Sequence, residues 1–213
     1  MRPSTPRMVA VRALLCCLPL AGCGGGGGGG GSTLPPVLSV TPVDLSGPFN
    51  PVTQTFGSLR FESPVLVPFG EDLGSTQSPA IEYITTPSAS VRACAAGQVE
   101  AVELNNGQGD YEVRVRSPAG SSWLVIYDHV RNVTVAVGEA VAAGDALGIS
   151  GTWSGSAGRT ELQVNDESRG VAVCPLGLGT AAFQAAHEAA RAAVSASAFG
   201  PLPSLCTADT VVP

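Results

Sequence analysis

Few side chains in this 213-residue chain could take part in chemistry. The chain contains two histidines, His129 and His187, and all 11 of its basic residues are arginine. An imidazole beside carboxylates can hold a divalent ion or transfer a proton at neutral pH, and His129 directly follows Asp128. His187 lies beside Glu188 in an alanine-rich stretch, so we expect it on the exposed side of a helix. His129 is therefore the histidine better suited to a functional site.

Three of the six cysteines lie beyond the N-terminal region, at Cys94, Cys174 and Cys206. An odd number allows at most one disulfide and leaves one thiol. Cys94 sits in an apolar stretch of small residues and is expected to be a buried thiol. Cys174 and Cys206 flank the C-terminal helical segment, so this pair is the favoured disulfide. A metal site made of all three is disfavoured, because no two of them have close ligand spacing.

The sequence around His129 predicts short antiparallel strands followed by one helix. A helix is expected near the C-terminus because apolar residues recur at helical spacing before Gly200-Pro201. The turn Asn105–Asp110 carries the residues typical of a hairpin. The expected strands are 91–102 (interrupted by a glycine turn), 111–116, 123–127, 160–164 and 171–173, and the expected helix is 180–197.

A glycine repeat follows the strand that contains His129. Gly138, Gly144, Gly148 and Gly151 recur with valines and a leucine in the segment 125–151. This rhythm resembles the barrel-sandwich hybrid fold shared by lipoyl and biotinyl domains and by lysostaphin/LytM-type zinc endopeptidases of peptidoglycan. The resemblance implies a mainly β fold of LytM-like antiparallel type with one C-terminal α-helix. A carrier domain is excluded, because the chain has no lysine to which lipoate or biotin could be attached.

The resemblance to the endopeptidases extends over residues 61–178. Tyr127-Asp128-His129-Val130 is similar to the Y-x-H-L motif of the family, and Val173-Cys174-Pro175-Leu176 is similar to its V-D/N-P-L motif. The segment from Val91 to Val99 is similar to its V-x-A…G-x-V segment. Order, spacing and glycine placement agree together, whereas each motif alone is weak.

The catalytic positions implied by the resemblance are where this chain departs from the family. Zinc in the family is held by H-x-x-x-D and by the second histidine of H-x-H, which leaves an open position for water. The histidine and aspartate of H-x-x-x-D fall on Ser78 and Glu82. The H-x-H motif falls on Arg159-Thr160-Glu161. Serine is a poor zinc ligand, and a guanidinium brings a fixed positive charge to the site.

We therefore expect no zinc or other cofactor and an ion pair of Arg159 with Glu82 or Glu161 instead. In this interpretation His129 is a polar residue at the end of a strand, with its hydrogen bonds satisfied within the protein. The alternative is a non-standard metal shell, because two carboxylates and one imidazole can hold a divalent ion. Two aromatic residues are candidate ligand contacts, Trp153 in a Gly/Ser loop beside the cleft and Tyr127 in the Y-x-H-L motif.

The N-terminus resembles a bacterial lipoprotein signal. Arg2, Arg7 and Arg12 precede or interrupt a short apolar stretch, and Leu20-Ala21-Gly22 then precedes Cys23. The resemblance implies that residues 1–22 are removed and that Cys23 is lipidated. An ordinary secretory signal with a chance cysteine is the alternative. The apolar stretch is shorter than the roughly 20 residues that span a bilayer.

A glycine run and a Pro/Ser/Thr-rich segment follow Cys23. Glycine-rich chain behaves as a flexible linker, so residues 23–51 are expected to be a tether, 52–178 the LytM-like domain, and 179–213 the C-terminal helix and tail. The net charge of −6 argues against nucleic acid as a partner and against a polybasic membrane-binding face.

The sequence thus predicts a lipid-anchored envelope protein whose domain is non-catalytic and binds peptidoglycan or regulates a cell-wall hydrolase. Membrane contact would come through the anchor alone. Gly24 follows Cys23 in place of the aspartate associated with inner-membrane retention, which favours the outer membrane facing the periplasm. The alternative is an active peptidoglycan metalloendopeptidase with the non-standard metal shell.

Overall fold

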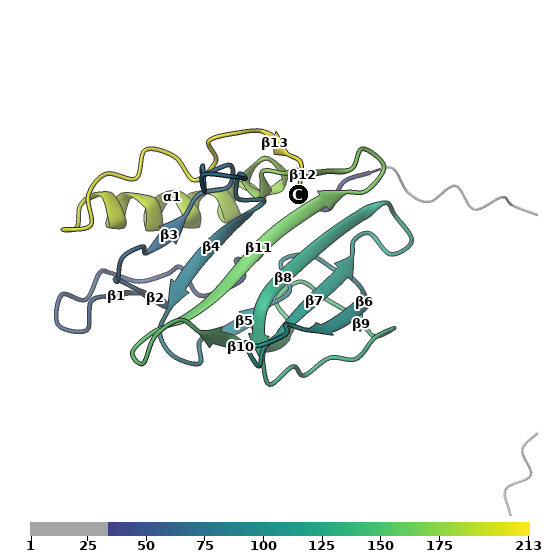
Figure 1. Cartoon of the computed structure of the whole chain (residues 1–213), viewed down its shortest axis with the longest axis horizontal. Coiled ribbons are helices and arrows are strands. Elements are labelled where there is room, and N and C mark those ends of the chain that lie inside the picture. Colours follow the sequence, from purple (N-terminus) through teal and green to yellow (C-terminus); the bar gives the residue numbers. More distant parts are fainter. Residues whose placement is uncertain (1–33) are drawn as a thin grey trace, which may run out of the picture. The chain divides into compact units, whose positions relative to one another are not determined.

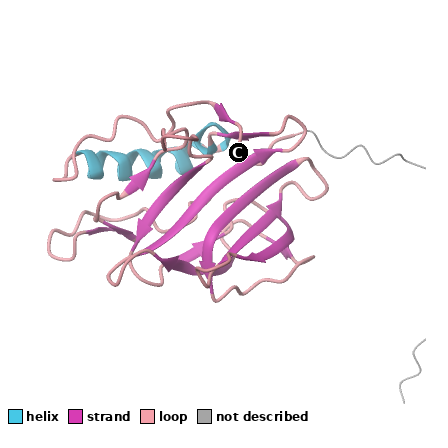
Figure 2. Ribbon diagram, viewed as in Figure 1, coloured by secondary structure: helices cyan, strands magenta, loops and turns pink. Residues whose placement is uncertain are grey.

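The computed structural model describes residues 34–213. In this part of the chain an antiparallel sheet carries one long helix near its β3–β4 side (Figures 1 and 2). The predicted signal 1–22, the lipidation site Cys23 and the tether up to residue 33 lie outside the described residues. Among residues 34–213 no helix is both long enough and apolar enough to cross a membrane.

The strands and helices are numbered as in Figure 1. They are β1 (Thr55–Phe56), β2 (Leu59–Arg60), β3 (Leu66–Val67), β4 (Ala80–Thr85), β5 (Ser90–Arg92), β6 (Gly97–Leu104), β7 (Tyr111–Arg116), β8 (Trp123–Arg131), β9 (Ala140–Val141), β10 (Ala146–Thr152), β11 (Gly158–Asp166), β12 (Val171–Val173), the 3₁₀ helix η1 (Pro175–Leu178), α1 (Ala181–Ser195) and β13 (Thr210–Val211).

Strand β11 is the centre of the sheet. It pairs antiparallel with β4 on one side and with β8 on the other. Its residues alternate strictly between buried and half-buried, as expected for a strand with one face on the core. The neighbouring β8 is almost wholly buried, because β7 and β10 also pair with it. These central strands carry the candidate site.

The predicted mainly β fold is confirmed, and several elements lie close to their expected bounds. Strands β7 and β12 coincide with the predicted ranges, and β8 and β11 are longer than predicted because their outer residues also pair. The repeat glycines Gly138, Gly144 and Gly148 all have positive φ angles, which glycine adopts without a side-chain clash. The short strands β1, β2, β3 and β13 were not predicted.

The predicted tether is wrong from about residue 38 onward. Leu38, Val43 and Leu45 are buried in the core, and Leu38 forms a parallel bridge with Gly179. The prediction relied on the prolines and serines of this segment and overlooked these three apolar residues. The apolar surface that they bury is enough to fix the segment on the domain. The domain therefore begins well before the expected boundary at residue 52.

The C-terminal region packs into the same core. Helix α1 begins after Thr180, whose side chain accepts a hydrogen bond from the Phe183 amide at 3.3 Å, a standard N-cap. Phe183, Ala190 and Val194 are buried. A disulfide joins Cys174 to Cys206, the pair that the sequence favoured.

The expectation that His187 is a surface residue is wrong. His187 is 1% exposed, because it follows Phe183 by one helical turn and so lies on the buried stripe of α1. Its Nδ1 donates to the Phe183 carbonyl and its Nε2 accepts from the Tyr83 hydroxyl, both at 2.8 Å. Burial lowers the pKa of His187 to about 4, so the imidazole is neutral at pH 7 and ties α1 to β4.

Candidate functional site

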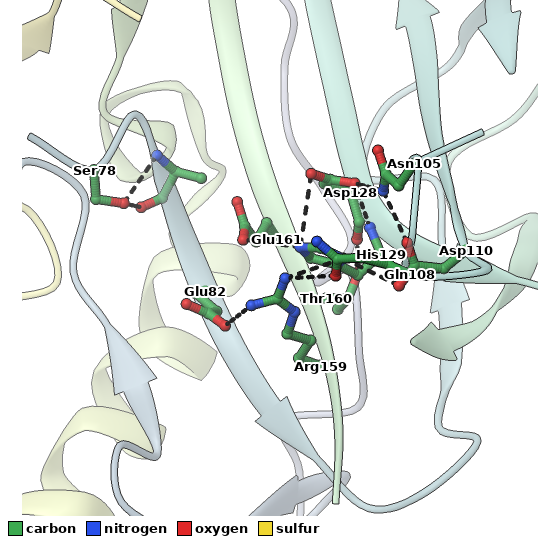
Figure 3. Close-up of polar contacts among 11 residues, drawn as sticks. Ser78, Glu82, Asn105, Gln108, Asp110, Asp128, His129, Arg159, Thr160 and Glu161 are labelled. Atoms are coloured by element: carbon green, nitrogen blue, oxygen red, sulfur yellow. Dashed lines mark hydrogen bonds and ion pairs between the residues drawn. The ribbon is translucent and has the colours of Figure 1, made fainter. Parts of the chain in front are cut away.

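The site begins as a row of carboxylates across three strands. Glu161 on β11 lies opposite Glu82 on β4 and opposite Asp128 on β8. Residues directly opposite in antiparallel strands point to the same face of the sheet. The register therefore places three acidic side chains side by side (Figure 3).

His129 joins this row because the backbone leaves the regular strand conformation at this residue. Successive strand side chains normally point to opposite faces, but His129 has a φ angle of +55°, in the left-handed region. Its Nε2 consequently lies 3.4 Å from Glu161 Oε1 and 3.7 Å from Asp128 Oδ2. The side chain is almost completely buried, with 4% of the residue exposed.

The other ring nitrogen of His129 faces a buried acid, Asp110. Its Nδ1 donates to Asp110 Oδ2 at 3.1 Å, since a carboxylate can only accept. A Cβ on Gly151 would lie 2.6 Å from the same oxygen and 3.0 Å from His129 Cβ. Glycine at this position is therefore what allows Asp110 and His129 to approach each other.

An amide group fills the space between the two aspartates. Asn105 Nδ2 donates to Asp110 Oδ1 at 2.9 Å and to Asp128 Oδ1 at 2.6 Å. Within residues 34–213, Asp110, Asp128 and His129 form the one group of side chains close enough together to hold a metal ion. Asn105 thus links the two carboxylates through one oxygen of each, and the group forms a hydrogen-bond network.

Arg159 supplies the positive charge of the site. Its Nη1 lies 3.5 Å from Glu82 Oε1, and its Nη2 donates to Gln108 Oε1 at 3.0 Å and lies 3.4 Å from His129 Nδ1. The guanidinium thus pairs with Glu82, one of the two partners expected from the sequence. Glu161, the other expected partner, contacts His129 instead.

The charges of the cluster shift two pKa values. Burial raises the pKa of Glu82, and the nearby charge of Glu161 raises it further, against the opposing effect of Arg159. Burial alone would lower the pKa of His129, but the contact with Glu161 and the charge of Asp128 outweigh it, so the pKa of His129 is raised. The acidic row therefore favours the protonated form of the imidazole.

Two predicted site residues do not belong to the cluster. Ser78 donates its hydroxyl hydrogen to the Ala80 carbonyl at 2.8 Å and lies apart from the other side chains in Figure 3. Tyr127 as a ligand contact is wrong, because it is 0% exposed. Its hydroxyl accepts from the Cys94 amide at 2.6 Å, and it alternates with Asp128 along β8 to point into the core.

Trp153 lies at the rim of the cluster, as its place in the sequence suggested. It is 39% exposed, and the Arg159 guanidinium carbon lies 5.5 Å from the centre of its ring. This distance is within the range of a cation–π contact. Trp153 is therefore the aromatic side chain of the site that solvent can reach.

Sequence reasoning missed the residues that support His129. Asp110, Asn105 and Gln108 all come from the hairpin turn between β6 and β7, which was recognised only as a turn. Nothing in the local sequence indicates that this turn folds over β8 to reach His129. The one available signal was the acid at Asp110, which directly precedes β7.

The fold and the order of these positions along β4, β8 and β11 define a domain of the lysostaphin/LytM type. Residues 76–175 match peptidase family M23, and the chain thus carries a domain of this family. No curated protein matches the chain significantly.

Several solved structures are similar to part of this chain at low identity. Lysostaphin from Staphylococcus simulans is 19% identical over 64% of this chain and 53% of its own, with a TM-score of 0.43. Csd3 from Helicobacter pylori is 19% identical over 49% of this chain and 27% of its own, with a TM-score of 0.41. The catalytic domain of EnpA from Enterococcus faecalis is 20% identical over 51% of this chain and 86% of its own, with a TM-score of 0.41. The chain thus spans about half of lysostaphin and about a quarter of Csd3.

Ser78 and Glu82, which the sequence resemblance assigns to two of the family's metal positions, do not fit a zinc ion. The Ser78 hydroxyl is committed to the Ala80 carbonyl, and the Glu82 carboxylate is paired with the Arg159 guanidinium. A guanidinium offers no lone pair to a metal ion. Its positive charge also repels a cation bound beside Glu82.

Proposed function

We propose that this protein is a lipid-anchored envelope protein whose M23 domain binds peptidoglycan without cleaving it. The observation that carries the proposal is the ion pair of Arg159 with Glu82. The resemblance to the family assigns a metal ligand to the position of Glu82. Without a metal there is no activated water for peptide hydrolysis. A site that has lost this chemistry still presents an exposed aromatic ring, that of Trp153.

Trp153 is the residue proposed to contact the wall. Indole rings supply a large rigid contact surface at a small entropic cost. We expect Trp153→Ala to reduce retention of the purified protein on isolated sacculi about tenfold, equivalent to about 1.4 kcal/mol. Val137→Ala, which shortens another exposed apolar side chain, should leave retention unchanged. Equal retention of wild type and Trp153→Ala would contradict the role of Trp153.

Catalysis is tested separately by zymography on peptidoglycan with added zinc. We expect no clearing, because the ion pair excludes the ion. Clearing that disappears in Glu161→Ala would instead support the alternative, a metalloendopeptidase with a non-standard metal shell. If sacculi do not retain the wild type but a wall hydrolase co-purifies with it, the domain acts as a hydrolase regulator.

Anchoring through Cys23 is part of the same proposal. In a diderm host, the wild type should incorporate labelled palmitate and fractionate with the outer membrane, whereas Cys23→Ser should do neither. Labelling of Cys23→Ser at the level of wild type would contradict lipidation at this residue. Secretion of the wild type as a soluble protein would favour the ordinary signal peptide.

A further inference from the structure

The loop that carries Trp153 is a short connection between β10 and β11. Its backbone closes on itself, since the amides of Trp153 and Ser154 both donate to the Ala157 carbonyl, at 3.0 and 3.1 Å. These bonds, together with the pairing of Thr152 with Gly158, fix the base of the loop. The tip of the loop, residues 154–156, extends beyond the paired residues and makes its further contacts with side chains outside the loop.

Glu62 supplies those contacts from a distant part of the chain. Its Oε2 accepts from the Ser154 hydroxyl at 3.1 Å, and its Oε1 accepts from the Ser156 hydroxyl at 2.5 Å. Glu62 precedes the residues that match the M23 family, so the N-terminal segment of this chain provides the link. Arg60 Nε lies 3.5 Å from Glu62 Oε1 and forms an ion pair with it.

Both carboxylate oxygens can act as acceptors at neutral pH. The hydrogen bond from Ser156 keeps the pKa of Glu62 below its usual range, so the group is ionised. Hydrogen bonds to a charged acceptor are stronger than neutral ones. Two such bonds to residues on either side of Gly155 fasten the tip of the loop.

The second contact of the loop is made by Arg159, which faces the Trp153 ring. Arg159 is itself fixed by Glu82 and Gln108. The ring therefore contacts the charged cluster, and the loop that carries the ring is linked to Glu62. A cation–π contact at a partly exposed site is worth only about 0.5–1 kcal/mol, which is too little to order a loop alone.

We propose that Glu62 is a positioning residue for the wall-binding surface, which fixes the loop so that Trp153 stands ordered beside the charged cluster. The inference rests on the proposed function for its ligand. A loop that is ordered before binding loses less conformational entropy on contact with the wall, so removal of the link lowers affinity even though Glu62 itself touches no ligand.

The position of the ring can be tested without any ligand. Acrylamide quenching of tryptophan emission measures the access of solvent to Trp153, with a Trp153→Phe variant giving the contribution of the buried Trp123 to be subtracted. We expect Glu62→Ala to raise the quenching constant of Trp153 about twofold. Glu71→Gln, which neutralises another acid of the N-terminal segment, should leave it unchanged. Unchanged quenching in Glu62→Ala would overturn the proposal.

The effect on binding is tested by a double-mutant cycle on isolated sacculi. Glu62→Ala should weaken retention three- to tenfold in the wild-type background and have no effect in the Trp153→Ala background. An equal loss in both backgrounds would show that Glu62 acts independently of Trp153, which also overturns the proposal.

Two further comparisons separate a local effect from loss of the fold. Ser154→Ala combined with Ser156→Ala removes the same two hydrogen bonds from the exposed loop and should reproduce the quenching and retention of Glu62→Ala. Thermal unfolding of each variant reports whether the core is intact. If sacculi fail to retain the wild type, the proposed function fails, whereas the quenching result still decides the role of Glu62.

Discussion

At the scale of single residues, the cluster depends on one unusual backbone conformation. His129 reaches the acidic row because its φ angle is positive, which costs a non-glycine residue of order 1 kcal/mol and persists only where surrounding contacts compensate. The buried Asp110 provides such a contact through Nδ1. The Asp128 carboxylate provides another, since its Oδ1 accepts from the His129 amide at 2.6 Å.

Gly151→Ala tests this arrangement. The added methyl group would lie 2.6 Å from Asp110 Oδ2, so Asp110 and His129 must move apart. We expect a loss of about 2 kcal/mol in the free energy of unfolding, measured by urea denaturation. Gly155→Ala is the matched control, because nothing lies within 4 Å of its added carbon. Equal stability of the two variants would contradict the close approach.

His187 makes stability depend on pH. The pKa of its folded form, about 4, is depressed from 6.5 by burial, so the unfolded chain binds more protons between these values. Stability is therefore complete above pH 6.5 and falls as the pH drops to 4, by about 3 kcal/mol. His187→Gln cannot titrate, and it should flatten this part of the stability profile. The same slope in both proteins would disprove the assignment.

At the scale of elements, the sequence predicted where several strands lie, but it did not predict which strands and turns contact one another. Alternating residues and glycine turns identified β7, β12 and α1 because these signals are local. The hairpin between β6 and β7 was also visible as a turn. That this turn would bring Asp110 and Gln108 to β8 and β11 depends on the twist and register of the sheet, which local patterns do not contain.

The buried stripe of α1 shows a related limit. Phe183, His187, Ala190 and Val194 share one face at spacings of three and four residues, yet a polar side chain on such a face is usually assumed to be exposed. The Tyr83 hydroxyl and the Phe183 carbonyl satisfy both ring nitrogens. Those partners become visible only when β4 and α1 are placed together.

The disulfide between Cys174 and Cys206 closes a loop around α1, with a sequence separation of 32 residues. Cross-linking a loop of this length is expected to stabilise the fold by about 3–4 kcal/mol, mainly by restricting the unfolded chain. The Cys174→Ser/Cys206→Ser double variant should lose this amount in urea denaturation. Reductant should destabilise the wild type to the same level and leave the double variant unaffected. A wild type insensitive to reductant under denaturing conditions would contradict the disulfide.

At the scale of the whole molecule, the fold extends beyond the residues that match the M23 family. The N-terminal segment contributes a set of buried apolar residues to the core, namely Leu38, Val43, Leu45, Phe56, Leu59, Phe61, Val65, Leu66 and Phe69. It also pairs β2 and β3 with the edge of β4. Composition suggested a tether only up to residue 51, so the prediction missed Leu38, Val43 and Leu45.

Truncation distinguishes the tether from the core. A chain that starts at residue 34 should unfold at the same temperature as a chain that starts at residue 24. A chain that starts at residue 63 loses Leu38, Leu59 and Phe61 together with their neighbours, and we expect it to be insoluble or to bind a hydrophobic dye without cooperative unfolding. Cooperative unfolding of this shortest chain, measured by circular dichroism, would contradict an integral N-terminal segment.

The bridge between Leu38 and Gly179 has a mechanical consequence for a protein held by its N-terminal end. The Leu38 amide donates to the Leu178 carbonyl at 3.0 Å, the Thr180 amide donates to the Leu38 carbonyl at 2.8 Å, and the Ser39 amide donates to the Cys94 carbonyl at 2.9 Å. If the protein is anchored through Cys23 as proposed, a pull from the membrane would load these bonds first. Residues 34–45 would peel away and absorb the extension before any tension reached β8 and β11, so the binding face would keep its shape while the cell wall moved relative to the anchor.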